Sequence, residues 1–206
     1  MIIACGTATS QSLDIVKKEF DIPIIGIIEP TVQYVKEKQI KKIGVIATTG
    51  TIRSKEWEKS LKSKINEIEV ISKACPLLAS IAEEGKIREP KSIETINGYM
   101  EKFKKEKVNT IILGCTHYPL YDQIIKDQFE TKVNLINVGT SVANYVKKYM
   151  EENKIENGKN KNNKEYISEN LKPTTKIIIT KEEFEFEKNA KNILKSTRTL
   201  DITNIN

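Results

Sequence analysis

The chain has 206 residues, of which 38% are hydrophobic and 30% are charged. This length and composition predict a globular protein of one large or two small domains and exclude a disordered chain. No apolar run approaches the roughly 20 residues that span a bilayer, and the opening stretch lacks the flanks of a signal peptide. Three cysteines are too few for a disulfide scaffold and favour the reducing cytoplasm.

The net charge of +6 raises the question of nucleic-acid binding. Most lysines stand beside glutamates, as in residues 36–38 and 101–107, and this pattern is typical of a solvated helix face. The chain has only three arginines, Arg53, Arg88 and Arg198, although arginine is the side chain used most to read base edges. We therefore expect no nucleic-acid partner and no membrane attachment.

Strand-like and helix-like segments alternate along most of the chain. In chain order, strands are expected at residues 2–4, 23–28, 42–47, 68–71, 108–113, 133–136 and 176–180. Helices are expected at residues 10–19, 31–38, 54–64, from 78 to 84, 91–106, 120–129 and 181–195, and the last residues allow a final strand. Continuously apolar strands that alternate with helices are typical of a parallel sheet covered on both faces. In such folds, ligands bind beyond the carboxyl ends of the strands.

The segment 151–172 breaks this alternation, because it is rich in lysine, glutamate and asparagine and nearly free of apolar residues. Its composition is typical of an exposed insertion or linker. An RNA-binding arm is the functional alternative, but the segment has no aromatic interleaving beyond Tyr166.

Two stretches each lead from an apolar strand into a cysteine that is followed closely by a threonine. The first contains Cys5 and Thr7, and the second contains Cys115, Thr116 and His117, the only histidine of the chain. Two thiols at strand ends suit the removal of a proton from one face of a carbon and its delivery to the other. An imidazole beside a thiol can shuttle the thiol proton. The alternative is a buried structural cysteine beside a surface histidine.

A third polar turn, residues 48–51, follows the strand expected at 42–47. Its hydroxyls and free backbone N–H groups could bind a carboxylate, or it could be an ordinary capped helix start. Thr9 or Ser10 is expected to cap the helix that follows Cys5. Cys75 and Trp57 are expected to pack in the core, and Glu83 could belong to a merely solvated helix end.

The sequence predicts neither a metal site nor a nucleotide cofactor. The cysteines are not paired at a spacing of two to four residues, and one histidine cannot complete a conventional zinc site. Neither glycine-rich phosphate-binding motif is present.

The motifs together resemble the glutamate racemases of the aspartate/glutamate racemase superfamily. The stretches that carry the resemblance are IIACGTATS at 2–10, GVIATTGTIRS at 44–54, CPLLASIAEEG at 75–85, LGCTHYPL at 113–120 and IIITKEEF at 177–184. The histidine in LGCTHYPL favours glutamate racemases, because related aspartate racemases usually lack it.

The resemblance implies an α/β fold of two pseudo-symmetric domains with mostly parallel sheets flanked by helices and the site in the cleft. The first domain would comprise residues 1–29 and 138–206, including the insertion 151–172, and the second would comprise residues 30–137. The first domain is expected to be incomplete and N-terminally truncated. Family members begin with a strand that carries an Asp-Ser-Gly motif and later have a Pro-Tyr-Gly loop, and both would precede this chain.

The activity that the resemblance implies is the cofactor-independent interconversion of L- and D-glutamate, which supplies D-glutamate for peptidoglycan in the cytoplasm. It assigns the catalytic roles to Cys5, Cys115, His117 and Glu83. It assigns substrate binding to Gly6, Thr7, Thr48, Thr51, Thr116 and His117, with Gly6 in place of the family's asparagine. A homodimer is an assembly that the resemblance allows.

Two alternatives remain open from the sequence. The chain could be a catalytically impaired or dead racemase fragment that only binds a ligand or a partner, and we expect low activity from a chain without the preceding motifs. It could also racemise another acidic amino acid, which His117 argues against and Gly6 leaves open.

Overall fold

The structure is a computed structural model, and it describes residues 1–155, 176–179 and 201–204. The chain divides into two compact units, Met1–Asn153 and Lys154–Asn206. All strand pairs in the described residues are parallel. The predicted α/β class with parallel sheets flanked by helices is confirmed.

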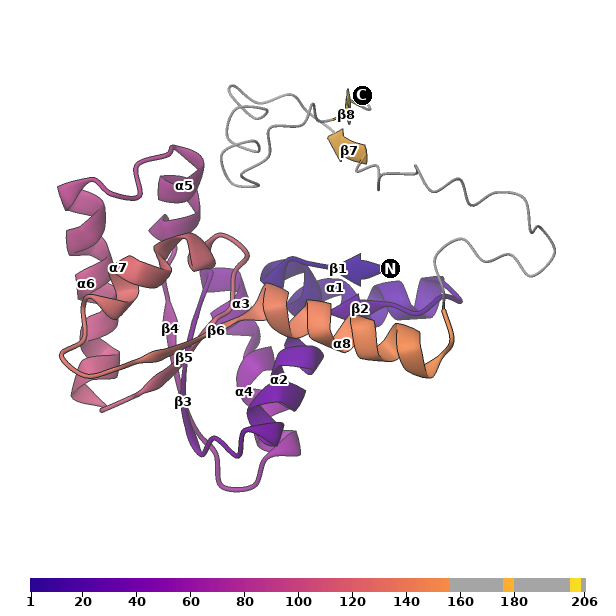
Figure 1. The fold of residues 1–206 in the computed structure, drawn as a ribbon, viewed down its shortest axis with the longest axis horizontal. Helices are drawn as coiled ribbons and strands as arrows, with labels where there is room; N and C mark the ends of the chain where they lie inside the picture. Colours follow the sequence, from indigo (N-terminus) through magenta and orange to yellow (C-terminus); the bar gives the residue numbers. More distant parts are fainter. Residues whose placement is uncertain (156–175, 180–200, 205–206) are drawn as a thin grey trace. The chain divides into compact units, whose positions relative to one another are not determined.

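A four-stranded parallel sheet forms the centre of the first unit (Figure 1). Its strand order is β4 (Glu69–Ala74), β3 (Lys42–Ala47), β5 (Thr110–Leu113) and β6 (Asn134–Asn137). The inner strands β3 and β5 are almost entirely buried, as the continuous apolar runs in their sequences predict. The carboxyl ends of β3 and β5 therefore lie side by side at one edge of the sheet.

Helices cover both faces of this sheet (Figure 1). On one face, Ile43, Val45 and Ile112 pack with α2 (Ile28–Glu37), α4 (Glu56–Lys64) and α8 (Val138–Glu152). On the other face, Ile46 and Ile111 pack with α5 (Leu77–Glu83), α6 (Pro90–Lys105), the 3₁₀ helix η1 (Tyr118–Tyr121) and α7 (Asp122–Lys126). Successive strand residues point to opposite faces, so one apolar run supplies both cores.

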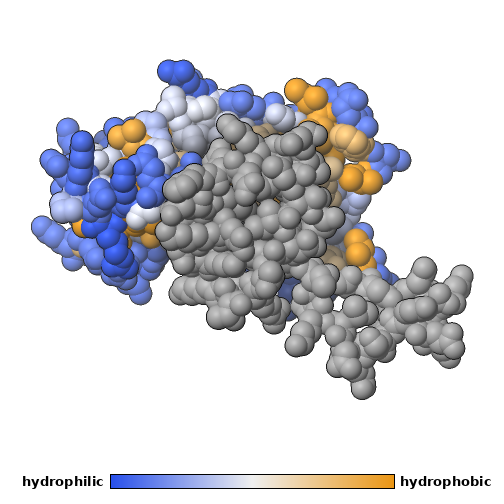
Figure 2. All heavy atoms as spheres, turned by 90° about the horizontal axis from the view of Figure 1, so that it is seen from above, coloured by the Kyte–Doolittle hydropathy of each residue, from blue (hydrophilic) through white to orange (hydrophobic). Residues whose placement is uncertain are grey.

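The first 26 residues form a separate βαβ unit. Strand β1 (Ile2–Ile3) leads into α1 (Gly6–Glu19) and pairs in parallel with β2 (Ile25–Gly26). Figure 2 shows exposed apolar side chains as separate areas among hydrophilic ones on the described surface. Five of the ten large apolar side chains that are exposed in the described residues belong to this unit: Met1, Ile2, Ile15, Phe20 and Ile22. Its apolar surface is therefore less completely covered than that of the four-stranded sheet.

Gly6 joins this βαβ unit to the four-stranded sheet. A Cβ atom at Gly6 would lie 2.4 Å from the carbonyl oxygen of Gly114, the residue after β5. Gly114 is equally constrained, because its own Cβ would lie 2.8 Å from the Ile46 oxygen, which accepts the Gly114 N–H. Two residues without side chains thus allow the start of α1 to approach the end of β5.

Several helix boundaries differ from the predictions. Helix α1 begins at Gly6 and is capped by Cys5, so the predicted cap at Thr9 or Ser10 is wrong. Thr9 instead donates its hydroxyl proton to the Ile3 carbonyl. The helix predicted at 54–64 is α4, which begins two residues later, after Lys55 with φ of 57°. A separate short helix, α3 (Thr49–Ser54), precedes it and was not predicted.

Two further segments were predicted incompletely. The helix expected at 120–129 is divided between η1 and α7, and Pro119 lies in the first turn of η1. Helix α8 was not predicted, although the Asn137 side chain caps it by accepting the N–H groups of Gly139 and Thr140.

In the second unit, β7 (Lys176–Ile179) pairs with β8 (Asp201–Asn204). Both strands were expected from the sequence. The helix predicted at 181–195 and most of the segment 151–172 lie outside the described residues, and the division at residues 29/30 and 137/138 stays a prediction. Among the described helices, none is both long enough and apolar enough to cross a bilayer.

We expect Gly6→Ala to lower the free energy of unfolding by about 1–3 kcal/mol, because the added methyl group forces the start of α1 away from the Gly114 carbonyl. Urea denaturation followed by circular dichroism measures the change. Gly98→Ala in α6 is the control, because no atom lies within 4 Å of its Cβ position; it should raise stability by up to about 1 kcal/mol. Unchanged stability in Gly6→Ala would contradict the close contact.

Candidate active site

The two cysteines occupy different environments on either side of the Gly6–Gly114 contact. Cys5 is exposed and forms the N-cap of α1, where its sulfur accepts the Ala8 N–H at 3.5 Å. Cys115 directly follows Gly114 and is 8% exposed. The Cys5 sulfur thus lies where the free N–H groups of a helix N-terminus point, and the Cys115 sulfur lies in the protein interior.

Burial raises the pKa of the Cys115 thiol. The backbone N–H groups of His117 and Thr116 act in the opposite direction, whereas negative charge on Cys5 or Glu83 raises the pKa further. Negative charge on Cys5 therefore favours the protonated form of Cys115.

His117 connects Cys115 to a carboxylate. Its Nδ1 lies 3.6 Å from the Cys115 sulfur, and its Nε2 lies 3.1 Å from Oε1 of Glu83. Glu83 is the last residue of α5, which follows β4, whereas Cys115 and His117 follow β5. The structure thus brings together three of the predicted catalytic residues, and the imidazole has one nitrogen for each partner.

Three threonine hydroxyls form a closed triangle at the starts of α1 and α3. The Thr7 oxygen lies 2.8 Å from that of Thr48 and 3.2 Å from that of Thr51, and the last two lie 3.0 Å apart. Thr48 also caps α3 by accepting the Thr51 N–H. Since hydroxyl hydrogens rotate, this cluster can turn its donors toward a bound anion.

The two remaining predicted substrate-binding positions contribute backbone rather than side chains. Gly6 is buried against Gly114. Any side chain at this position would require the contact to open. Thr116 is exposed, and its backbone N–H faces the Cys115 sulfur.

Sequence reasoning missed two tyrosines behind the Glu83–His117 contact. Tyr118 donates its hydroxyl proton to the Cys75 carbonyl at 2.7 Å, and Tyr121 donates to the Leu78 carbonyl at 2.6 Å. Both side chains are fully buried, and burial raises the pKa of Tyr121 to about 12. Tyr118 stands within the LGCTHYPL motif, but no spacing in the sequence reveals its acceptor.

The packing roles predicted for Cys75 and Trp57 are confirmed. Cys75 is fully buried, and burial raises its pKa to about 12. Trp57 is 1% exposed, and its indole N–H has no hydrogen-bond partner in the described part of the chain. Within the same residues, no three His, Cys, Asp or Glu side chains group in a way that could hold a metal ion.

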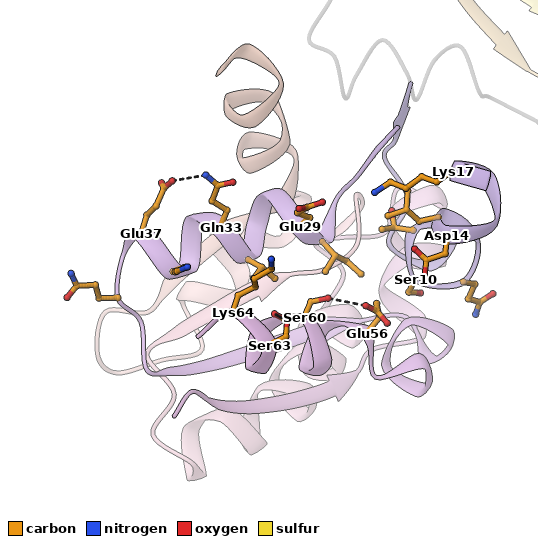
Figure 3. Close-up of a pocket in the computed structure, with 17 residues that line it drawn as sticks. Ser10, Asp14, Lys17, Glu29, Gln33, Glu37, Glu56, Ser60, Ser63 and Lys64 are labelled. Carbon is orange, nitrogen blue, oxygen red and sulfur yellow. Dashed lines mark hydrogen bonds between the residues drawn. The ribbon is translucent and has the colours of Figure 1, made fainter. Parts of the chain in front are cut away.

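A separate groove of about 720 Å³ lies between α1, α2 and α4 (Figure 3). Charged side chains from all three helices line it, including Lys17, Glu29, Glu56 and Lys64. Neither the cysteines nor the threonine triangle lines this groove. It is therefore distinct from the candidate active site.

The chain belongs to the Asp/Glu/Hydantoin racemase family, whose sequence profile matches residues 1–146. It is 37% identical over 148 residues to a glutamate racemase from a Sulfurihydrogenibium species, covering 71% of this chain and 56% of the relative. It is 40% identical over 144 residues to a glutamate racemase from Lactococcus lactis, covering 69% of this chain and 53% of the relative. The chain thus spans little more than half the length of these relatives.

Solved glutamate racemases share the fold. The structure matches an isoform from Bacillus anthracis with a TM-score of 0.86 and 29% identity, over 100% of this chain and 73% of the other. It also matches an enzyme from Francisella tularensis, solved with D-glutamate, with a TM-score of 0.85 and 27% identity, over 100% of this chain and 72% of the other.

The three cysteines should react with iodoacetamide in a fixed order. At pH 7.5 we expect Cys5 to be alkylated first because it is exposed, Cys115 more slowly, and Cys75 only after unfolding. Raising the pH should increase the Cys115 rate by about tenfold per unit while its thiolate is a minor species. Mass spectrometry of the tryptic peptides measures the order, and faster labelling of Cys115 than of Cys5 would contradict it.

Proposed function

We propose that this chain carries the active site of a cofactor-independent glutamate racemase. The observation that supports this most strongly is the close backbone contact between Gly6 and Gly114, because Cys5 directly precedes the first of these glycines and Cys115 directly follows the second. The family membership and the match to an enzyme solved with D-glutamate favour an acidic amino acid as the substrate.

In the proposed reaction, the substrate Cα lies between the two sulfurs. A thiolate on one side takes the Cα proton, so that the Cα–H bond breaks and an S–H bond forms. The thiol on the other side then gives its proton to the opposite face of the carbon, which inverts the centre. Each turnover leaves the thiol and the thiolate exchanged between Cys5 and Cys115, and the reverse reaction restores them.

His117 and Glu83 would assist the buried thiol. Burial disfavours the Cys115 thiolate, and an imidazole that can accept the thiol proton offsets this cost. The imidazole orientation in turn depends on the contact between Nε2 and Glu83.

The threonine triangle would hold a substrate carboxylate. Thr7, Thr48 and Thr51 offer three rotatable hydroxyl donors next to the starts of α1 and α3. The free N–H groups at the start of α1, together with its dipole, favour an anion at the same place. Gly6 and Thr116 would contribute backbone atoms to the substrate site.

We extend the proposal to the protein's setting. Three free cysteines suit the reducing cytoplasm, where the product D-glutamate would serve peptidoglycan synthesis. A first domain of residues 1–29 and 138–206, with residues 30–137 as the second, stays part of the proposal. The separate two-stranded sheet of β1 and β2 supports the division after residue 29 alone. A homodimer is compatible with this proposal.

A second candidate is a racemase-like protein that binds an acidic amino acid but turns it over poorly. The exposure of Cys5 favours this candidate, because a proton donor open to water exchanges its proton with solvent and is poorly placed to deliver it selectively.

Deuterium exchange at Cα distinguishes the two candidates. Purified protein is incubated with L- or D-glutamate in D₂O, and NMR and circular dichroism follow deuteration and inversion. A racemase should introduce deuterium and invert the centre from either enantiomer, and L- and D-aspartate should react more slowly. Binding of glutamate without exchange would favour the second candidate, and neither binding nor exchange would contradict both.

Cys115→Ser should lower the exchange rate by about 10³-fold or more. A serine hydroxyl is a far weaker acid than a thiol, so the loss of the thiol leaves one face of the substrate without a base. Cys5→Ser should have a comparable effect, whereas Cys75→Ser is a control for loss of a thiol outside the site. Retained racemisation in Cys115→Ser would contradict the assignment of the two bases.

A further inference from the structure

The contact between Glu83 and His117 spans two strands that are not neighbours. Glu83 ends the helix that follows β4, and His117 lies beyond β5, whereas β3 runs between β4 and β5. Strands in a sheet are about 4.8 Å apart, so the two connections start about 10 Å from each other. The sheet itself does not bring the carboxylate to the imidazole.

The ion pair is too exposed to hold α5 in place by itself. The Glu83 side chain is 64% exposed and the His117 side chain is 32% exposed. Exposed pairs of this kind contribute little net stability, because water screens them and both side chains lose freedom on pairing. The attachment of the α5 backbone, which carries Glu83 as its last residue, therefore contributes to where the carboxylate lies.

Two buried hydroxyl groups make that attachment. Tyr118 donates to the Cys75 carbonyl and Tyr121 to the Leu78 carbonyl, and both pairs are 43 residues apart in sequence. The two donors are one turn apart on η1. Of the two acceptors, Leu78 is the second residue of α5 and Cys75 lies two residues before the helix. Two hydrogen bonds three residues apart thus restrict both the rotation and the position of the start of α5 relative to η1.

We propose that Tyr118 and Tyr121 are positioning residues for the Glu83–His117–Cys115 relay. This inference rests on the proposed function, in which the relay serves the buried thiol. By holding α5 against η1, the two hydroxyls keep Glu83 at Nε2 of His117. A carboxylate at Nε2 retains the ring proton there and leaves the lone pair of Nδ1 directed at the Cys115 thiol.

The position of the ring proton can be measured directly, because His117 is the only histidine of the chain. In ¹⁵N-labelled full-length protein at a pH of about 8.5, above the ordinary titration of histidine, the imidazole nitrogen shifts report the tautomer without ambiguity of assignment. We expect the Nε2–H form to predominate in the unsubstituted protein. Glu83→Ala should lower the ratio of Nε2–H to Nδ1–H toward that of a histidine side chain in water, and serves as the positive control.

Tyrosine-to-phenylalanine substitutions remove the hydroxyls and keep the buried rings. In the double variant Tyr118→Phe/Tyr121→Phe, the ratio of Nε2–H to Nδ1–H tautomers should fall by about three- to tenfold, the factor that corresponds to hydrogen bonds of ordinary net strength. Each single variant should give a smaller change. If the double variant does not fold, Tyr121→Phe alone tests the inference. Tyr118 is the direct neighbour of His117, whereas Tyr121 is four residues away, so Tyr121→Phe leaves the residue next to the imidazole unchanged.

Ile125→Val is the matched control for lost stability. Ile125 is fully buried in the same apolar cluster as both tyrosines but has no hydrogen-bonding group to link η1 to α5. This variant should be destabilised and keep the tautomer ratio of the unsubstituted protein. A wild-type ratio in the folded tyrosine variants, or an equal change in Ile125→Val, would overturn the inference.

The Cα exchange reaction separates this inference from the proposed function. If the protein racemises glutamate, the double variant should lower kcat by about three- to tenfold with KM changed less than about twofold, because the relay acts on the thiol rather than on substrate binding. If no racemisation occurs but the tautomer ratio depends on the tyrosines, the positioning role stands and the proposed function fails. Racemisation with an unchanged kcat in the double variant would reject the positioning role alone.

Discussion

The close approach of Gly6 to the Gly114 carbonyl is the contact on which the candidate site depends. Cys5 directly precedes one of these glycines and Cys115 directly follows the other, so the backbone contact sets how near the two thiols can come. A side chain at either position would meet backbone atoms of a neighbouring element, which cannot move aside as a flexible side chain can. The absence of two side chains thus matters as much as the presence of two thiols.

The surroundings of Cys5 and Cys115 differ in exposure and in polarity. Cys5 is exposed at the N-terminus of α1, where its sulfur accepts the Ala8 N–H and meets water. Cys115 is buried in the apolar cluster under α5 and η1, where negative charge is disfavoured and the His117–Glu83 pair offers the compensation. An amino acid bound between them would meet a polar site on one face and a shielded thiol on the other.

Much of the fold was predictable because a strand that is buried on both faces is a continuous apolar run in the sequence. Strand β3 has the predicted bounds, since the run from Lys42 to Ala47 is apolar almost throughout and is covered on both faces. The start of α1 was placed four residues too late, because cysteine is not among the usual capping side chains and Cys5 nevertheless caps the helix. Helix α3 was not predicted as a separate element, because nothing in the local sequence marks the positive φ of Lys55 that separates it from α4.

The sequence by itself determined the chemical groups of this protein: two thiols at strand ends, one histidine, a hydroxyl-rich turn and the motifs of a racemase family. Only the tertiary structure decided which of these groups meet. Thr7 contacts Thr48 across 41 residues, Glu83 reaches His117 past an intervening strand, and two tyrosine hydroxyls find carbonyls 43 residues away. Such contacts follow from the spatial order of the strands and the packing of the helices between them, and neither is encoded in the spacing of the residues that touch.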